Sequence, residues 1–188
     1  MGPTMTKPDL APIASDLATD LDGAFAGYVR ATADGIFSGS LRMLGDRGDA
    51  EDVMQETYAR AYAALQGYST ARIKALKVSG WTWTIAANLC RNRLRSRARK
   101  PKTSLEGFDV AGTGADTEEQ ALSQIGMTLQ DALLDLPFPQ RAAVVMRHVL
   151  DLTYEDVSVA LDRPIGTVKA DIHRGLARLR QAYPEEAI

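Results

Sequence analysis

The chain of 188 residues has little of what metal centres, disulfides and membrane spans require. It contains one cysteine, Cys90, and two histidines, His148 and His173. A single cysteine cannot form an internal disulfide, and two distant histidines do not have the spacing of a zinc site. No apolar run approaches the roughly 20 residues that cross a bilayer, and the first 20 residues do not resemble a secretory signal. We therefore expect a cytoplasmic protein with no membrane insertion, no bound metal and no other cofactor.

Catalytic signatures are also missing from the sequence. There is no glycine-rich phosphate loop, no nucleophile elbow and no calcium-binding loop. Five carboxylates between positions 46 and 56 could hold a metal, but no histidine lies near them to act as a base. We expect no enzymatic activity and keep a metal-dependent enzyme as an alternative that rests on Asp46, Asp49, Glu51, Asp52 and Glu56.

The net charge of −2 is the sum of segments that differ strongly. Residues 91–102 carry 7 basic side chains and no acidic one, whereas residues 103–135 carry 7 acidic and no basic ones. A polyanion responds to the local basic patch and not to the total charge. The distribution therefore favours nucleic-acid binding by part of the chain.

Apolar residues recur at helical spacing through most of the chain, and no strand pattern appears. We expect helices over about 21–44, 49–65, 81–99, 138–149, 153–161 and 165–182, with Asp49 as the N-cap of the second and residues 67–80 as a loop. The sequence predicts an all-α protein. Its expected parts are a flexible tail (1–19), a helical bundle (20–100), a flexible acidic linker (101–124) and a helix-turn-helix domain (125–188).

The helix over 81–99 has two different faces. Its core stripe consists of Trp83, Ala87, Cys90 and Leu94, which makes Cys90 an inert buried thiol. Its basic stripe offers an aromatic plane, an amide and a row of guanidinium groups: Trp81, Asn88, Arg91, Arg95 and Arg99. Unpaired bases stack on aromatic rings and phosphates pair with arginine, so this stripe suits single-stranded DNA. The alternative is a solvated basic helix end with Trp81 in the core.

The last two helices have the pattern of a helix-turn-helix. Thr153 caps the first helix, with Asp156 as the acid of a capping box, and Asp162-Arg163-Pro164 makes the turn. The second helix buries Ile165, Val168, Ile172, Leu176 and Leu179 and presents Lys169, Ala170, His173 and Arg174 on its other side. A basic second helix fits the major groove of DNA. A plain helical hairpin with a solvated face is the alternative.

Three stretches together resemble the extracytoplasmic-function group of sigma factors of bacterial RNA polymerase. The first is Asp49–Thr57, and the second is Trp81–Asn88 with the arginine-rich run that follows it. The third comprises Leu136-Pro137 with Arg141, Leu152–Val157, Ile165–Lys169 and His173-Arg174. The resemblance covers about residues 20–100 and 125–182, in the order and at the spacing of the family. Asp171 departs from it, because relatives often carry a basic residue at this position.

The resemblance implies a role for each stretch. Asp52, Gln55 and Glu56 match positions that dock on the β′ clamp helices of core polymerase. Trp81, Asn88, Arg91, Arg95 and Arg99 fall in the helix that reads the promoter −10 element, and Asn88 lies beside the flipped base. The loop from Tyr68 to Gly80 matches the pocket for that base. The positions that match contacts to the −35 element are Arg147, Lys169, Ala170, His173 and Arg174.

The implied partners are core RNA polymerase, through the β′ clamp helices and the β flap, promoter DNA and an anti-sigma factor. A sigma factor directs initiation and aids DNA melting, while the polymerase does the chemistry. Its place is the cytoplasm, on the nucleoid through the polymerase. The alternative function is a helix-turn-helix regulator that is not a polymerase subunit. Such a regulator has no need of a docking helix and a second DNA-reading helix.

Overall fold

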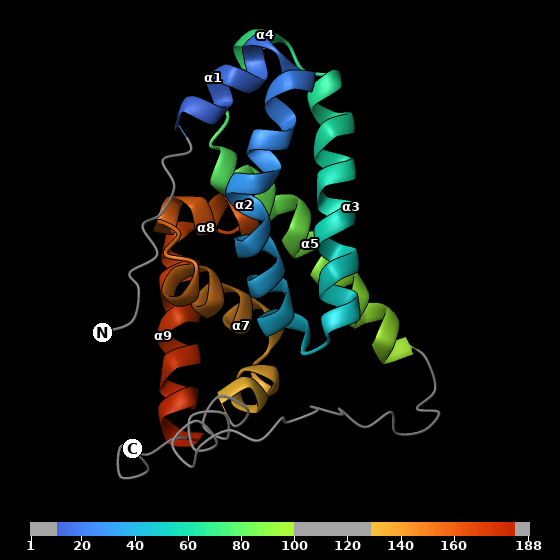
Figure 1. Ribbon diagram of the computed structural model, residues 1–188. Coiled ribbons are helices and arrows are strands. Elements are labelled where there is room, and N and C mark those ends of the chain that lie inside the picture. The colour runs from blue at the N-terminus through green and yellow to red at the C-terminus, as the bar shows by residue number, and fades with distance from the viewer. Residues whose placement is uncertain (1–10, 100–128, 183–188) are drawn as a thin grey trace, which may run out of the picture.

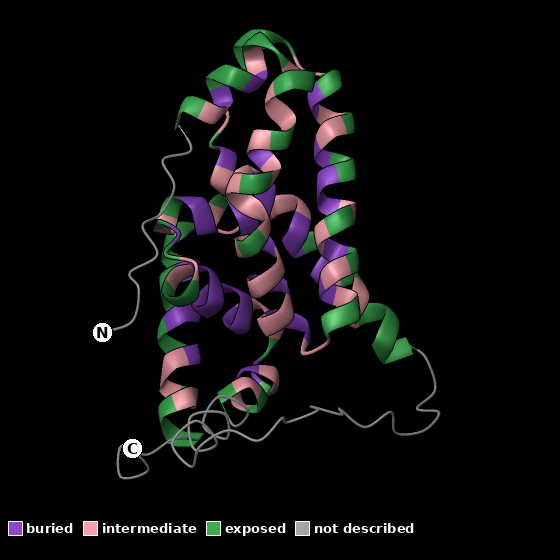
Figure 2. Ribbon diagram, in the orientation of Figure 1, coloured by how far each residue is buried: buried purple, intermediate pink, exposed green. Residues whose placement is uncertain are grey.

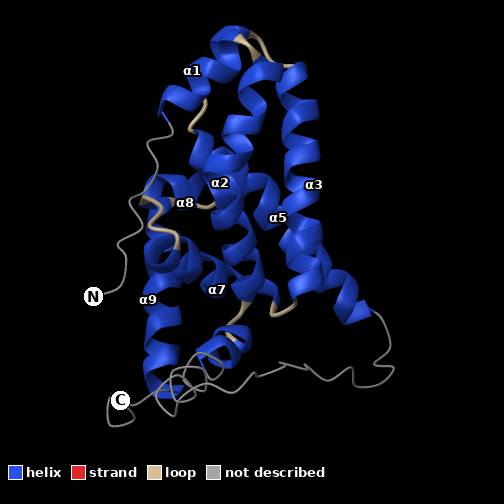
Figure 3. Cartoon of the chain, in the orientation of Figure 1, coloured by secondary structure: helices blue, strands red, loops and turns tan. Residues whose placement is uncertain are grey.

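The computed structural model describes residues 11–99 and 129–182, and every regular element in these ranges is helical (Figure 3). The N-terminal unit consists of α1 (Ala11–Thr19), α2 (Leu21–Leu44), α3 (Arg47–Gln66), α4 (Thr70–Lys74) and α5 (Val78–Arg99). The C-terminal unit begins with helical residues 129–135. It continues with α7 (Phe138–Val144), the π-helical turn η1 (Val145–Val149), α8 (Tyr154–Leu161) and α9 (Ile165–Ala182). The all-α prediction is confirmed, and the expected linker lies outside the described residues.

The N-terminal unit is built around α2, which packs against α1, α3 and α5 (Figure 1). Asp20 caps α2 through the backbone N–H of Gly23, and Gly45 ends it with a φ of 69°, a left-handed conformation that glycine adopts without strain. In the core, the Tyr28 hydroxyl lies 2.7 Å from the Thr82 hydroxyl on α5. Burial raises the pKa of Tyr28, and Tyr28 meets the rings of Phe25 and Tyr58 edge to face.

Helix α3 begins earlier than expected. Its N-cap is Asp46, whose carboxylate accepts the backbone N–H of Asp49 at 2.7 Å. Asp49 lies inside the first turn, where its negative charge stabilises the helix by interacting with the positive end of the helix dipole. The expectation that Asp49 caps this helix is therefore wrong, since the preceding aspartate already has the extended backbone that a cap requires.

Two segments expected to be irregular contain helices. Residues 67–80 hold α4, capped by Ser69 and anchored by the buried Ile73, and α5 begins at Val78. Residues 11–19 form α1 instead of a tail, because Ala14 and Leu17 are buried one turn apart. A helix this short gains most of its stability from packing against the rest of the protein. The hydrophobic periodicity of so few residues is therefore a weak signal in the sequence.

The two units share one hydrophobic core (Figure 2). Helix α8 packs against α5, and α7 and η1 pack against α2. The sequence indicated two domains joined by a linker, and the contact between them is information that only the structure supplies. In Figure 1, α9 and α3 lie at opposite edges of the molecule. The side of α9 away from α7 and α8 stays exposed.

The capping box of α8 provides a test of the fold. The Thr153 hydroxyl accepts the backbone N–H of Asp156 at 3.1 Å, and the Asp156 carboxylate returns a contact to the Thr153 backbone N–H. Thr153→Ala should lower the free energy of unfolding by about 1 kcal/mol, because an N–H of the first turn loses its acceptor. Urea denaturation followed by circular dichroism measures this loss. Thr153→Ser keeps the oxygen and should stay close to wild type, so equal losses in both variants would contradict the cap.

Candidate nucleic-acid interface

The core stripe of α5 fixes the direction of every other side chain on that helix. Trp83, Ala87 and Cys90 are buried and Leu94 is half-buried, as their spacing predicted. Burial raises the pKa of the Cys90 thiol to about 11. The thiol is therefore expected to stay protonated at neutral pH, and its burial agrees with the predicted place of Cys90 in the core.

The basic stripe of α5 lies largely on the surface. Asn88, Arg95 and Arg99 are exposed, and Arg91 is half-buried. Arg91 donates to the Asn88 side-chain oxygen at 2.8 Å and lies 5.7 Å from the centre of the Phe138 ring. The stripe thus offers an amide and guanidinium groups to a ligand beside α5, with Arg91 already oriented by Asn88.

Trp81 is placed differently from the rest of the basic stripe. It is half-buried and meets the ring of Tyr68 edge to face, with 6.2 Å between ring centres. The Arg72 guanidinium lies 3.6 Å from the centre of that tyrosine ring. The three side chains join the segment before α5 to the beginning of α5. Sequence reasoning did not single out Arg72, because its pairing with Tyr68 depends on the unexpected helix α4.

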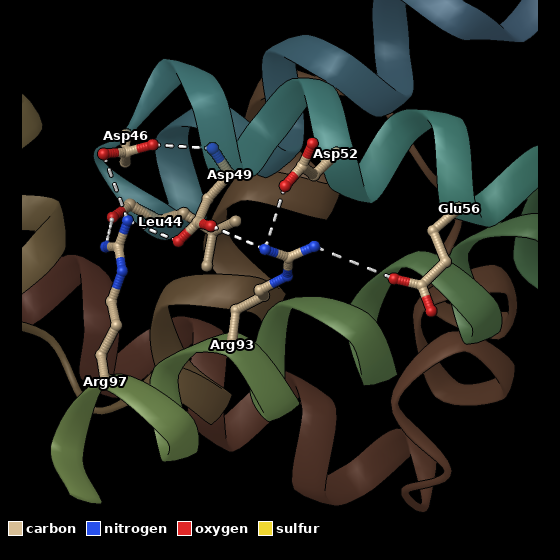
Figure 4. A network of polar contacts seen from close by, with 7 residues as sticks. All are labelled: Leu44, Asp46, Asp49, Asp52, Glu56, Arg93 and Arg97. Atoms are coloured by element: carbon tan, nitrogen blue, oxygen red, sulfur yellow. Dashed lines mark hydrogen bonds and ion pairs between the residues drawn. The ribbon is translucent and has the colours of Figure 1, made fainter. Parts of the chain in front are cut away.

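The arginine-rich run of α5 divides into two rows. Arg91, Arg95 and Arg99 belong to the basic stripe, whereas Arg93 and Arg97 point to the acidic side of α3 (Figure 4). Arg93 contacts Asp49 at 3.0 Å and Asp52 at 3.1 Å, with Glu56 at 3.9 Å. The charge count could not separate the rows. Their helical spacing could, because a shift of two positions turns a side chain by about 200°.

Arg97 closes the same network at the beginning of α3. It contacts Asp49 at 2.5 Å and Asp46 at 3.3 Å, and it donates to the carbonyl oxygen of Leu44 at 3.0 Å (Figure 4). Asp49 is the most enclosed member, with 18% of its side chain exposed. The carboxylates considered as a metal site are thus neutralised by arginines. In the described part of the chain, no group of three or more His, Cys, Asp or Glu is placed to hold a metal ion.

Two of the side chains expected to dock on a partner, Asp52 and Glu56, lie on the side of α3 that meets Arg93 of α5. Gln55 is exposed, as is more than half of the Asp52 side chain. Glu56 is half-buried and accepts two bonds from Arg60, at 3.0 Å and 2.6 Å. The structure therefore brings Asp52 and Glu56 together around Arg93 and leaves Gln55 open to solvent.

Helices α8 and α9 form the predicted helix-turn-helix. The capping box at Thr153 and Asp156 is confirmed, and the turn includes Asp162 with a φ of 52°. Side chains on the outer side of α9 are exposed, as expected: Lys169, Ala170, His173 and Arg174. Ile165 was expected in the core, but it is 37% exposed, because it lies in the first turn beyond the packed part of the helix.

Ion pairs occupy some of these basic groups. Asp171 is buried and contacts both Arg163 and Arg174, the latter at 2.8 Å. Arg147 contacts Asp151 at 2.9 Å, and this hydrogen bond raises the pKa of the guanidinium. Lys169 and Arg147 both lie over the ring of Tyr154, 5.2 Å and 5.3 Å from its centre. Asp171, which departs from the family pattern, thus holds the turn and α9 together.

Buried Arg141 connects the two units. It donates to the carbonyl oxygen of Met43 at 2.5 Å and to those of Leu134 and Leu136 at 2.6 Å and 2.9 Å. Burial lowers the pKa of this guanidinium. The oxygen of Met43 belongs to the last turn of α2, where carbonyl groups have no partner within the helix. Arg141, which belongs to the C-terminal unit, therefore provides a hydrogen-bond donor for a carbonyl group at the end of α2.

Comparisons with known protein families match the two helical units separately. The family pattern described as Sigma-70 region 2 matches residues 28–100, and that described as Sigma-70, region 4 matches residues 126–179. The chain is 34% identical over 171 residues to the ECF RNA polymerase sigma factor SigW of Bacillus subtilis (strain 168), covering 84% of this chain and 88% of that protein. It is 36% identical over 155 residues to SigE of Mycolicibacterium smegmatis, covering 81% of this chain and 58% of that longer protein.

Two solved structures have a similar fold. One is CnrH in complex with the cytosolic domain of CnrY, with a TM-score of 0.65 and 18% identity over 91% of this chain and 94% of that chain. The other is the sigma factor RpoE of Bartonella quintana in complex with the anti-sigma factor NepR, with a TM-score of 0.65 and 20% identity over 86% of this chain and 98% of that chain.

Among the helices of the described ranges, none combines the length and apolarity needed to cross a membrane.

The two arginine rows of α5 should respond differently to mutation. Arg93→Ala should lower the free energy of unfolding by about 1 kcal/mol, because it removes contacts to Asp49 and Asp52 within a network. Arg95→Ala, two positions along the same helix on its exposed side, should change it by less than about 0.5 kcal/mol. Urea denaturation at low salt compares the variants, and the difference should shrink at about 1 M salt, which screens exposed charges. Equal effects of the two substitutions would contradict the division of the rows.

Proposed function

Because this chain belongs to the extracytoplasmic-function group of RNA polymerase sigma factors, which direct transcription from promoters, we propose that it recognises promoter DNA through both of its helical units. Residues 20–100 bind core polymerase and the −10 element, and residues 125–188 bind the −35 element. Sigma factors are not enzymes, so the chain supplies recognition and aid in melting while the polymerase does the chemistry.

The observation that carries this proposal is that α5 and α9 each present exposed groups suited to DNA, on opposite units of one chain. Asn88 and Arg95 are exposed on α5, and Lys169, His173 and Arg174 are exposed on α9. An amide and guanidinium groups suit an unpaired strand, whereas a basic second helix suits a major groove. A regulator that acts without polymerase has no use for the first surface, and the match to region 2 does not favour it.

Helix α3 is the proposed docking surface for the β′ clamp helices of core polymerase. Asp52 and Gln55 are exposed on this helix, and Glu56 is half-buried. Arg93 contacts Asp52 and lies near Glu56, so it holds these carboxylates at the surface of α3. The β flap of the polymerase is the proposed partner of the C-terminal unit.

The C-terminal unit reads the −35 element in this proposal. Lys169, Ala170, His173 and Arg174 enter the major groove, and Arg147 meets a phosphate. Arg174 contacts Asp171, which orients the guanidinium on the outer side of α9. The protein acts in the cytoplasm, on the nucleoid through the polymerase.

An anti-sigma factor is a further proposed partner. The structure of RpoE from Bartonella quintana was solved with the anti-sigma factor NepR. This chain resembles that sigma factor over most of its length, which supports a partner of the same kind.

Assembly with core polymerase tests the proposal as a whole. The protein should elute with purified core in gel filtration, and the mixture should start run-off transcripts at defined sites in a genomic library. The double substitution of Gln55→Ala and Glu56→Ala should weaken core binding about tenfold or more, since tenfold is about 1.4 kcal/mol and truncating hot-spot residues of an interface costs about 2 kcal/mol or more. Anisotropy titration with labelled protein measures this affinity.

The control for docking is Gln66→Ala, an exposed position at the far end of the same helix. It should leave core affinity unchanged. The double variant loses the Glu56 contacts to Arg60 and Arg93 as well, so its urea denaturation is measured in parallel. Unchanged core affinity in a folded double variant would remove α3 from the docking surface.

Asn88 provides the test of promoter melting. Asn88→Ala should leave core binding unchanged and reduce open-complex formation, because the amide is exposed on the basic stripe and extruding a base costs a few kcal/mol that contacts must offset. Permanganate footprinting on a promoter found by run-off transcription measures this, since only unpaired thymines react. Ser96→Ala, exposed further along α5, is the matched control. Normal reactivity in the Asn88 variant would exclude Asn88 from melting.

A further inference from the structure

Helix α9 carries a charged residue on the side that packs against the rest of the C-terminal unit. The buried residues of this helix are Val168, Asp171, Ile172 and Gly175. A Cβ atom added at Gly175 would lie 2.7 Å from a side-chain carbon of Val144 on α7, so the packing at this point is close. Only 4% of the Asp171 side chain is exposed. A carboxylate in such a place needs partners, because burial removes the water that would otherwise solvate it.

Two arginines are those partners, one for each oxygen of the carboxylate. Oδ2 of Asp171 contacts a terminal nitrogen of Arg163, which lies in the turn between α8 and α9. Oδ1 accepts a hydrogen bond at 2.8 Å from a terminal nitrogen of Arg174, three residues further along α9. Because Arg163 holds one oxygen, the second oxygen stays directed at Arg174.

Arg174 is held by this contact and is still open to a ligand. Its side chain is 57% exposed, on the outer side of α9 that also carries Lys169, Ala170 and His173. A guanidinium has five N–H donors, so the contact with Asp171 leaves several of them for a second acceptor. The arrangement therefore fixes the direction of the Arg174 donors without using all of them.

The buried carboxylate does not favour DNA binding in general. A negative charge so close to the outer side of α9 repels phosphates, whatever the sequence to which they belong. It is also a weak source of stability, because ion pairs that lose their hydration gain little over apolar packing. What the carboxylate provides is a fixed direction for Arg174. A fixed guanidinium can donate two parallel hydrogen bonds to one base edge without first losing conformational freedom.

We propose that Asp171 is a positioning residue: it does not touch DNA, and it fixes the Arg174 guanidinium so that α9 discriminates the base pair that Arg174 reads. The inference rests on the proposed role of α9 at the −35 element. The group that fits a fixed guanidinium is a guanine edge, whose N7 and O6 atoms accept two hydrogen bonds in the major groove. Lys169 is held differently, over the ring of Tyr154 at 5.2 Å from the ring centre.

Holoenzyme reconstituted from core polymerase and the full chain measures this discrimination. The templates are a promoter mapped by run-off transcription and its variants with each single base-pair change across the −35 element, competing in one reaction. The ratios of the transcripts give a discrimination factor for every position. Arg174→Ala identifies the base pair that Arg174 reads, as the position where discrimination falls. Lys169→Ala identifies its own position in the same way.

Asp171→Asn should lower discrimination at the Arg174 position about three- to tenfold, because an amide oxygen holds a guanidinium less firmly than a carboxylate does. Discrimination at the Lys169 position should stay as in wild type. Binding of the full chain to an unrelated duplex, measured by anisotropy, should be at least as tight as in wild type, since one negative charge is removed. Unchanged discrimination in the folded variant would overturn the proposal, and so would an equal loss at all positions.

The matched control is Asp162→Asn, which makes the same substitution in the turn before α9. Asp162 is exposed and follows the end of α8 with a φ of 52°, a left-handed conformation that asparagine also adopts. The control removes the same charge and should leave discrimination at every −35 position unchanged. A loss of the same size in both variants would show an effect of charge alone and would contradict the positioning role.

A double-mutant cycle separates positioning from a purely structural role. In the proposal Asp171 acts through Arg174, so adding Asp171→Asn to Arg174→Ala should lower discrimination no further at any position. A carboxylate that only held the turn would lower it further at other positions, which would reject the proposal. If Asp171→Asn does not fold, Arg163→Gln decides by the same criteria, because it removes the contact that directs the carboxylate and should relax the same base pair.

The inference and the proposed function can fail separately. If Arg174→Ala changes discrimination at no position, the proposed reading of the −35 element by Arg174 fails, and the inference fails with it. If Arg174→Ala relaxes one base pair and the folded Asp171→Asn variant does not, the positioning role of Asp171 is rejected alone.

Discussion

Burial of the core stripe of α5 is the constraint on which the rest of the structure depends. Trp83, Ala87 and Cys90 are fixed in the core, so the remaining directions around the helix are assigned by geometry. One direction meets the acids of α3, and another meets α8 at Thr84 and carries the exposed Asn88 and Arg95 further along the helix. A helix with a single buried stripe can thus contact α3 on one side and present polar groups on another.

The arginines show how this geometry separates roles that charge alone would combine. Arg93 and Arg97 neutralise carboxylates of α3, with Asp49 between them. Those carboxylates come from the helix proposed to dock on polymerase, so the same ion pairs connect it to α5, the helix proposed to contact DNA. Arg91 and Arg95, two positions away on the helix, are turned toward the C-terminal unit. Substitution of an arginine in one row is therefore not equivalent to substitution of the arginine two positions away, which belongs to the other row.

The contact between the units is built from backbone as much as from side chains. Gly80 admits the backbone of α8, and Arg141 binds the carbonyl end of α2. These contacts add to the hydrophobic core that the two units share. Arg141 also binds the carbonyl oxygens of Leu134 and Leu136, so it is a structural part of the C-terminal unit as well.

The sequence by itself determined the longer helices of the two units, the core stripe of α5, the capping box of α8 and the family to which the chain belongs. These features depend on local periodicity and on side chains a few residues apart, which a sequence shows directly. It did not determine that Asp46 caps α3 in place of Asp49, that α1 and α4 are helices, or that Ile165 is exposed. It also could not assign Arg93 and Arg97 to α3, or place α8 against Gly80. Those outcomes depend on groups that are distant in the chain, and only the tertiary structure decides which of them meet.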